Sequence, residues 1–516
     1  MPTFQNNSRL TELAALLVTI FGTGMVYLDQ SAINVALPHI QTALDADVGG
    51  LQWLIDIYIL VLAVLLLIGG ALGDRYGRVR LFRLGLIIFA LASIACGLAN
   101  SLGVLIAARA VQGLGGALLV PGGLAIVNAT TAPERRGQML GWWGTFTPLV
   151  VLSGPLVGGW LVDNVSWRAI FFLNLPLGLV ALIASYYVPE SRNEQSVKTQ
   201  LDWPGVMALM IGLGGLLFGL IEGPAVGWNG GIIAALTGGV IGLLVFVWIE
   251  SRSPAPLLPL PLFRNRAFAG INLLSLVHYF ALSGIFFFLT LNLQQVQGYT
   301  AFQSGLAYLP INIALISMGR PIGKLIDRLG AVPLMIAGVA VTGLGFLLFT
   351  LPGFSDNYWT SFFPALAVYG IGLGLTIVPL TAVAMGSLPS NLSGIASGFN
   401  NAITRVSQML AVALLGAILV SSFRASLTQR TATIPLPDPA RAELLASVRD
   451  LGATRPPEGI AAETAQTVEA AIRLSFVDAF RQMMLICAGL TVVSLIITLS
   501  LPRAGRVQQA APVEAT

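Results

Sequence analysis

The sequence predicts an all-helical integral membrane protein, and three observations carry this prediction. Of the 516 residues, 56% are hydrophobic and 10% are charged, with a mean hydropathy of +0.83, whereas soluble domains carry about 25% charged residues. The chain is divided into apolar runs near twenty residues long, the length of a helix that crosses a bilayer. A charged turn, Gly70–Gly77, recurs as Gly323–Gly330, which predicts two related halves.

Composition also excludes several classes of protein. A net charge of +4 and a pI near 9.2 are compatible with nucleic-acid binding, but the basic residues lie in short loops between apolar runs, where they orient membrane spans. No nucleic-acid partner is therefore expected. Cys96 and Cys487 lie inside apolar runs and form no C-x-x-C spacing, so the sequence predicts no disulfide, no metal site and no cofactor.

Fourteen membrane spans are predicted from the apolar runs. The first, at residues 12–38, is too long for the core of a signal peptide and lacks an A-x-A cleavage site, so we expect it to be retained. The others are expected at residues 50–72, 81–100, 103–128, 138–162, 168–188, 204–222, 232–250, 268–296, 301–320, 332–351, 358–386, 394–422 and 476–501.

The two copies of the charged turn follow the second and the tenth span and divide the chain into three parts. Residues 1–188 are expected to form an N-terminal six-helix bundle, and residues 268–516 a C-terminal one. Residues 189–267 form a linker with two inserted spans. Because these spans carry charged residues only at their ends, we expect them to face lipid or to pack between the bundles.

The distribution of basic residues predicts the orientation of the chain. Most of the 27 lysines and arginines lie on the side that also holds both termini, and short cytoplasmic loops carry this excess. Both termini are therefore predicted to be cytoplasmic. The long, proline-rich segment 424–475, which belongs to the C-terminal bundle, is then extracytoplasmic, and residues 440–451 are expected to form a short surface helix within it.

Few charged side chains lie inside the predicted spans, and each needs a partner or a function because a charge there costs about 3 kcal/mol. They are Asp29, Asp56, Arg109 and Arg405, and His278 is the only histidine inside a span. An aspartate beside a movable arginine can exchange protons as a cavity opens and closes. We therefore predict Asp29 and Asp56 as proton carriers with Arg109 as partner. The alternative is that each holds helices together by hydrogen bonds.

Two polar stripes are predicted to line a midplane substrate cavity. Arg109 and Gln112 lie on one face of the fourth span. Asn401, Arg405 and Gln408 follow the i, i+4, i+7 spacing of one face in the thirteenth. Hydrogen bonding between helices explains such residues equally well, and His278 is expected to be a wall residue of the cavity.

Glycines surround a proline in the fifth span, at Gly154, Pro155, Gly158 and Gly159. Proline bends a helix and small residues allow close packing, so the segment is predicted to act as a hinge or seal. Small residues at this spacing are, however, also common in spans that have no mechanism.

These stretches together resemble the major facilitator superfamily, and within it the fourteen-span drug:proton antiporter branch, along nearly the whole chain. The matching motifs are the signature hairpin with Gly73, Asp74, Arg75, Gly77 and Arg78, the first-span segment Leu28–Pro38, Arg109-x-x-Gln112-Gly113, Gly154-Pro155-x-x-Gly158-Gly159, and Trp167-Arg168-x-x-Phe171-x-x-Asn174.

The resemblance implies alternating access between two bundles around a central site. It makes Asp29 the coupling acid, places Asn34 of the same motif at the substrate cavity, and makes the hairpin around Asp74 a cytoplasmic latch. Asp327 and Arg328 in the second hairpin are a weaker match, because Lys324 and Ala331 interrupt the basic run. The glycine-proline motif resembles the one characteristic of exporters.

The predicted function is proton-coupled multidrug efflux of amphipathic neutral or monocationic compounds. The protein is expected to be a monomeric, multi-pass, non-enzymatic transporter of a bacterial cytoplasmic membrane, with the lipid bilayer, protons and a small amphipathic substrate as partners. Pro189-Glu190-Ser191-Arg192 is similar to part of a sugar-porter signature but lacks its final proline, so we assign it to an ordinary loop.

Three other classes are weighed against this prediction. An ATP-driven pump needs G-x-x-x-x-G-K-[ST], and Gly319–Leu325 has the wrong spacing and no hydroxyl. An intramembrane aspartyl protease also uses two aspartates within spans, but its sequence motifs are missing around Asp29 and Asp74. An uptake symporter of the same fold is the closest rival, and only the exporter-like motif and the branch resemblance argue against it.

Overall fold

The computed structural model describes residues 8–131, 133–191, 201–354, 357–388 and 393–501, and all regular structure in these ranges is helical. A first group of helices contains α1 Ser8–Ala43, α2 Val48–Tyr76, α3 Arg78–Gly97, α4 Leu102–Thr130, α5 Pro133–Asn164, α6 Ala169–Phe172 and α7 Asn174–Ser185. An inserted pair follows, with α8 Trp203–Val226 and α9 Gly230–Glu250.

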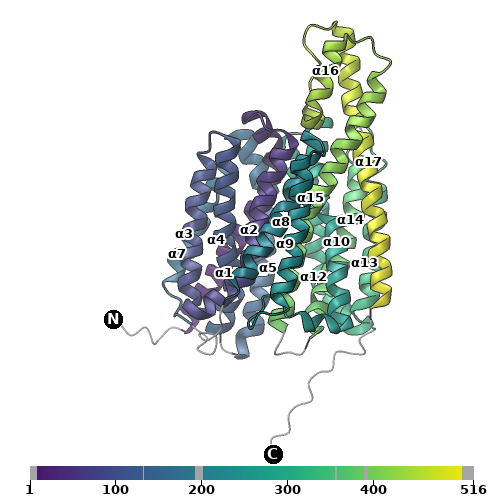
Figure 1. Ribbon diagram of the computed structural model, residues 1–516. Helices are drawn as coiled ribbons and strands as arrows, with labels where there is room; N and C mark the ends of the chain where they lie inside the picture. Colours follow the sequence, from purple (N-terminus) through teal and green to yellow (C-terminus); the bar gives the residue numbers. More distant parts are fainter. Residues whose placement is uncertain (1–7, 132, 192–200, 355–356, 389–392, 502–516) are drawn as a thin grey trace, which may run out of the picture.

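The second group begins after a short 3-10 helix at Leu260–Arg264. It contains α10 Arg266–Leu291, α11 Ala301–Ala307, α12 Leu309–Leu329, α13 Ala331–Leu348, α14 Phe362–Gly386, α15 Ser393–Thr431, α16 Asp438–Ala446 and α17 Ala462–Ser500. Two irregular turns join it, a π-helical turn η3 at Asn292–Val296 and a 3-10 helix η5 at Ser447–Ala453. Figure 1 shows the two groups side by side, with α8 and α9 crossing in front of the seam between them.

Twelve helices among the described residues are long and apolar enough to cross a membrane. Shorter apolar stretches, Leu149–Asn164 and Ala169–Ser185, occupy the positions of the predicted fifth and sixth spans. The polytopic helical fold is therefore confirmed. The count of fourteen spans is not confirmed, because the described residues contain twelve candidate spans.

The inserted pair packs between the two groups through α8, which contacts both α2 and α15. The Trp53 indole of α2 donates a hydrogen bond to Glu222 Oε1 of α8 at 2.9 Å, which fixes α8 against the first group. Of the two placements expected for the inserted spans, facing lipid or packing between the bundles, α8 has the second.

Segment 424–475 is more helical than the sequence indicated. The helix expected at residues 440–451 is present as α16 and η5, but α15 runs on to Thr431 and α17 begins at Ala462. Arg430 of α15 pairs with Asp478 of α17 at 2.6 Å, which joins the two extensions. Figure 1 shows this part standing beyond the ends of the other helices. We call the side that carries it the α16 end and the opposite side the termini end.

The two copies of the charged turn have the same backbone geometry. Gly77 and Gly330 both have positive φ, at +108° and +83°, where glycine is the favoured residue. Each donates its N–H to the carbonyl four residues earlier, Gly73 at 2.9 Å and Ile326 at 2.8 Å. The internal repeat read from the sequence is therefore a structural repeat that ends one helix and starts the next.

Candidate proton-coupling site and the seam between the helix groups

Asp29 of α1 lies at the centre of a buried polar cluster inside the first group. It is 2% exposed, and its partner Arg109 of α4 is fully buried. Arg109 Nη1 donates a hydrogen bond to Asp29 Oδ2, and Gln112 Nε2 donates to Asp29 Oδ1 at 2.9 Å. Arg109 and Gln112 share one face of α4, as their spacing predicts. Gln112 therefore lies with the candidate proton carrier, on the inside of the bundle.

Two further residues of the cluster were not predicted as site residues. Asn174 Nδ2 of α7 donates to Asp29 Oδ1 at 2.7 Å. Ser93 Oγ of α3 accepts hydrogen bonds from Gln112 at 2.9 Å and from Asn174 at 3.2 Å. Asn174 appeared in the sequence only as part of a family motif, and the signal at Ser93 was a lone uncharged polar residue within an apolar run.

The Arg109 guanidinium is held on two sides. Its centre lies 4.1 Å from the ring centroid of Tyr58, a cation–π contact, and its Nε donates to the Leu54 carbonyl at 3.3 Å. Asp29 accepts from three side chains, an arrangement that suits an ionised carboxylate. A proton on Asp29 would weaken its ion pair with Arg109. The cluster can therefore couple protonation of Asp29 to release of Arg109.

Asp56 of α2 is equally buried but has no partner. Its exposed fraction is zero, and neither carboxyl oxygen finds a hydrogen-bond donor among the described residues. Gln52, one turn earlier on the same face, donates to the Val412 carbonyl of α15 at 2.5 Å, so Asp56 lies on the side of α2 that meets the second group. A carboxyl buried without a donor is far less costly when it carries a proton.

The residues predicted to line the substrate cavity are dispersed. Arg405 Nη1 reaches across the seam to Gln30 Oε1 at 2.9 Å, and Asn34 donates to the Gln30 carbonyl at 3.0 Å. Asn401 is exposed, Gln408 is half-buried, and His278 is buried in α10 with neither ring nitrogen bonded to a described group. The structure links Arg405 and Asn34 through Gln30.

The first charged hairpin is engaged within its own helix group. Arg78 pairs with Asp74 at 2.8 Å, and Arg75 lies 5.4 Å from the Tyr76 ring centroid. In the second hairpin, Asp327 and Arg328 are both exposed and form no ion pair with any described residue. The two copies therefore differ in side-chain contacts, although their backbone turns agree.

Glu190 lies in the loop predicted at Pro189-Glu190-Ser191-Arg192, of which Arg192 is outside the described residues, and it has a structural role there. The Glu190 carboxylate accepts the backbone N–H groups of Val79 and Arg80, each at 3.0 Å. It thus caps the first turn of α3, whose N–H groups have no partner within the helix. A side chain at Gly77 would also collide with it, at 2.8 Å from the Glu190 carboxyl.

The glycine-proline motif of α5 packs against two helices at once. A Cβ at Gly154 would lie 2.0 Å from Ser31 Oγ of α1, and one at Gly159 would lie 2.6 Å from the Ala301 carbonyl of α11. Pro155 lies against α11 as well, because its carbonyl would be 2.2 Å from a Cβ at Gly305. The geometry favours the seal over the hinge of the two predicted roles.

Eight hydrogen bonds between described residues of the two helix groups lie from Gln30 towards the α16 end. They join Gln30 to Arg405, Val35 to Gln294, Gln41 to Gln295 and to the Asp450 carbonyl, Asp47 to Arg449, Gln52 to Val412, and Asp163 to Ala301 and Phe302. The seam is therefore bonded shut at the α16 end.

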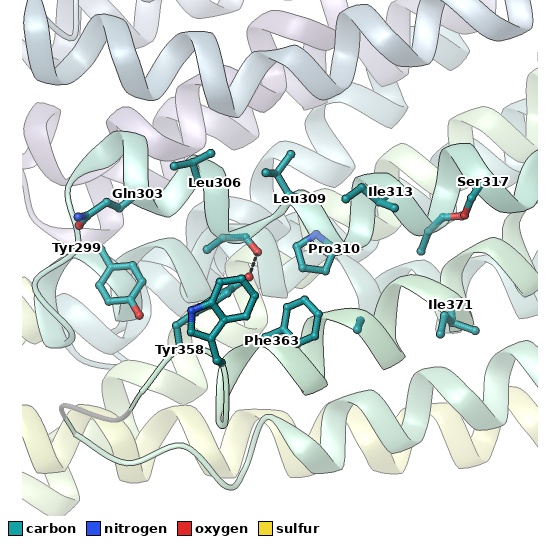
Figure 2. Close-up of a pocket in the computed structure, with 14 residues that line it drawn as sticks. Tyr299, Gln303, Leu306, Leu309, Pro310, Ile313, Ser317, Tyr358, Phe363 and Ile371 are labelled. Carbon is teal, nitrogen blue, oxygen red and sulfur yellow. Dashed lines mark hydrogen bonds between the residues drawn. The ribbon is translucent and has the colours of Figure 1, made fainter.

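A separate groove of about 910 Å³ runs along the second group between α11, α12 and α14. Figure 2 shows it lined by apolar side chains such as Leu306 and Ile313, with Tyr299 and Gln303 at one end and a hydrogen bond from Tyr358 to the Ala307 carbonyl, 2.9 Å long, beside it. Ile313 is 62% exposed on this face. The groove contains none of the predicted cavity residues, and its composition suits contact with lipid hydrocarbon.

Comparison with known proteins gives matches over most of the chain. The family model described as "Major Facilitator Superfamily" matches residues 19–412. The multidrug resistance protein Stp of Mycobacterium tuberculosis is 35% identical over 85% of this chain and 81% of its own length. The tetracenomycin C resistance and export protein of Streptomyces glaucescens is 31% identical over 90% and 86%.

Solved structures agree on the fold. A bacterial homologue of the human lysosomal transporter Spinster, in an inward-facing and unoccupied conformation, aligns with a TM-score of 0.65 at 15% identity over 96% of this chain and 98% of that chain. At this identity the likeness concerns the fold.

Proposed function

The chain belongs to the Major Facilitator Superfamily, and from this premise we propose that it exports amphipathic compounds in exchange for protons. Relatives described as resistance and export proteins support efflux of drug-like compounds. The observation that carries the proton coupling is the buried Asp29–Arg109 pair. We also place the chain in the fourteen-span branch, with α5 and the α6–α7 segment as the two spans beyond the twelve.

The proposed cycle is alternating access about the seam. If the basic loops are cytoplasmic, the α16 end faces outside, and the bonded seam closes the protein towards the exterior. Asp29 would be ionised and paired with Arg109 in this state. Opening of the α16 end would admit an external proton to Asp29, release Arg109, and so connect proton entry to the movement of the two groups.

The proposed substrates are amphipathic and neutral or singly charged. Of the two classes expected from the sequence, the neutral one has more support, because Arg109 already occupies Asp29 and leaves no free carboxylate there for a cation. A monocation would depend on Asp56, whose carboxyl has no partner in this state. The aspartyl protease alternative finds no support, because Asp29 and Asp56 form no carboxyl dyad.

Everted membrane vesicles test the proposal. An imposed proton gradient, acidic inside, should drive accumulation of a fluorescent amphipathic compound in vesicles that contain the parent protein. Asp29→Asn should abolish this accumulation, whereas Asp478→Asn, which removes a carboxylate that pairs with Arg430 in the second group, should leave it intact. Accumulation only in right-side-out vesicles would instead identify an uptake symporter. Full activity of Asp29→Asn would refute the assigned role of Asp29.

A further inference from the structure

Arg405 brings a positive charge into the seam without a carboxylate to balance it. The side chain is 6% exposed. Its Nη1 donates to Gln30, and its guanidinium centre lies 5.1 Å from the Tyr27 ring centroid. No aspartate or glutamate in the described ranges forms an ion pair with it. Burying a guanidinium without a counter-ion costs free energy. The presence of Arg405 here therefore indicates that a ligand binds it.

The position of Arg405 on α15 gives it access to such a ligand. Arg405 and Val412 lie two turns apart on one face of α15, and Val412 contacts Gln52 of the first group. Asn401 lies one turn before Arg405 on nearly the same face and is exposed. The Gln30 contact is the bond between the groups nearest to the termini end. Arg405 therefore lies at the edge of the bonded part of the seam that is nearest to the termini end.

Both buried aspartates of the first group are unable to neutralise this charge. Asp29 is held by Arg109, Gln112 and Asn174 inside the first group. The Asp56 carboxyl forms no bond to Arg405 or to any other described donor. The guanidinium offers five N–H donors in a planar fork, and among the described residues only Gln30 accepts from it. The remaining donors match the two oxygens of a carboxylate.

We propose that Arg405 recognises an anionic group on the substrate, so that the exported compounds include amphipathic monoacids such as aromatic or medium-chain carboxylic acids. This inference rests on the proposed export function and defines its substrate class. The carboxylate binds the free side of the Arg405 fork, and the apolar body lies along the seam beside Tyr27. A monocation is repelled at the same position.

The same position links substrate binding to the proton site. Arg405 binds Gln30 of α1, the residue that follows Asp29 in the chain, and Asp29 pairs with Arg109. Neutralising Arg405 with a bound carboxylate removes a positive charge beside this part of α1 and leaves Arg109. A bound substrate anion therefore changes the electrostatic potential at the Asp29–Arg109 ion pair, which must separate during the transport cycle.

A matched pair of probes tests this inference: a dansylated medium-chain carboxylic acid and its primary amide, which differ in charge and little in shape. In everted vesicles the parent protein is expected to accumulate both. Arg405→Gln should lower accumulation of the acid about tenfold or more, since a hydrogen bond between charged groups is lost, while the amide changes less than twofold. Arg405→Lys should retain part of the acid transport, because it keeps the charge and loses the fork.

The outcomes separate this inference from the proposed function. Equal losses of acid and amide in Arg405→Gln, or transport of the amide but not of the acid by the parent, would overturn the role of Arg405 and leave proton-driven export standing. Transport of neither compound by the parent, under a gradient that is shown to be present, would overturn the proposed function. Amide transport by Arg405→Gln also shows that the variant is folded.

Discussion

The Asp163 carboxylate at the end of α5 accepts the backbone N–H of Phe302 at 2.8 Å, so a residue of one helix group caps the first turn of a helix in the other. The N–H of Ala301 binds the second oxygen at 3.0 Å. The positive end of the α11 dipole thus faces a carboxylate across the seam. Separation of the two groups at the α16 end would break this contact.

Asp163→Ala is expected to favour opening of the α16 end. Loss of a helix-capping side chain costs about 1 kcal/mol, which corresponds to roughly a fivefold shift between open and closed populations. Spin labels are placed at the exposed positions Val165 and Thr428 in a variant without Cys96 and Cys487. In Asp163→Ala, a larger fraction of molecules should have a long distance between the two labels. Asp163→Asn, which keeps an acceptor oxygen, should shift the population less, and an unchanged distribution in Asp163→Ala would count against the cap.

Asp74→Asn is expected to slow turnover while leaving substrate affinity nearly unchanged. The Asp74–Arg78 pair lies at the termini end, away from Asp29, and is partly exposed, so its loss costs about 0.5 kcal/mol and does not unfold the protein. Glu190→Ala should have the same kinetic effect, because it releases the first turn of α3. Substrate dose–response curves in vesicles give both parameters. A large loss of affinity at full turnover would place Asp74 in binding rather than gating.

The contact between η5 and the α1–α2 turn is expected to weaken as pH rises on the side of the α16 end. Burial and the nearby charges of Asp47 and Asp45 raise the pKa of Asp450 above its ordinary value of 3.8, and Arg449 opposes them. A carboxyl with a raised pKa contributes stability below its ordinary pKa, and that stability is lost as pH climbs from 3.8 through the raised value. Ionised Asp450 then repels Asp47, which holds Arg449 at 3.1 Å.

Hydrogen exchange of residues 447–453 should therefore accelerate across the pH interval just above 3.8, after correction for the intrinsic exchange rate. Asp450→Asn should remove this dependence, whereas Arg473→Gln, at an ion pair within α17, should keep it. A pH-independent profile in the parent would contradict the role given to Asp450.

Asp56→Asn is expected to reduce the charge that moves per substrate. One proton crossing about 100 mV gains roughly 2.3 kcal/mol, and one pH unit adds about 1.4 kcal/mol. If Asp29 and Asp56 each carry a proton, export of a neutral compound moves two charges, and the variant moves one. For a monocation the variant exchange becomes electroneutral and responds to pH alone. Reversal potentials at clamped pH measure the number of charges moved per substrate, with Asp478→Asn as the control. The same number in Asp56→Asn and in the parent would leave Asp56 a structural residue.

Much of the architecture is determined by the sequence. The apolar runs fix the helices, because a backbone in lipid must satisfy its own hydrogen bonds. The recurrence of Gly77 at Gly330 fixes the repeat, because only glycine adopts that backbone geometry readily. The three-residue spacing of Arg109 and Gln112 places them on one face because helical pitch is constant. These properties are local, so a single chain segment is enough to show them.

Tertiary structure decides which distant residues meet. Asn174 reaches Asp29 from α7, and Ser93 of α3 joins the cluster by accepting hydrogen bonds from Asn174 and Gln112. Both contacts depend on how these helices are rotated about their axes, which the spacing within either helix does not show. The same holds for Glu190 at the start of α3 and for Gln30 opposite Arg405. Helical pitch sets the direction of a side chain relative to its own helix. Its partner is set by how whole helices pack, which depends on the summed contacts of many residues.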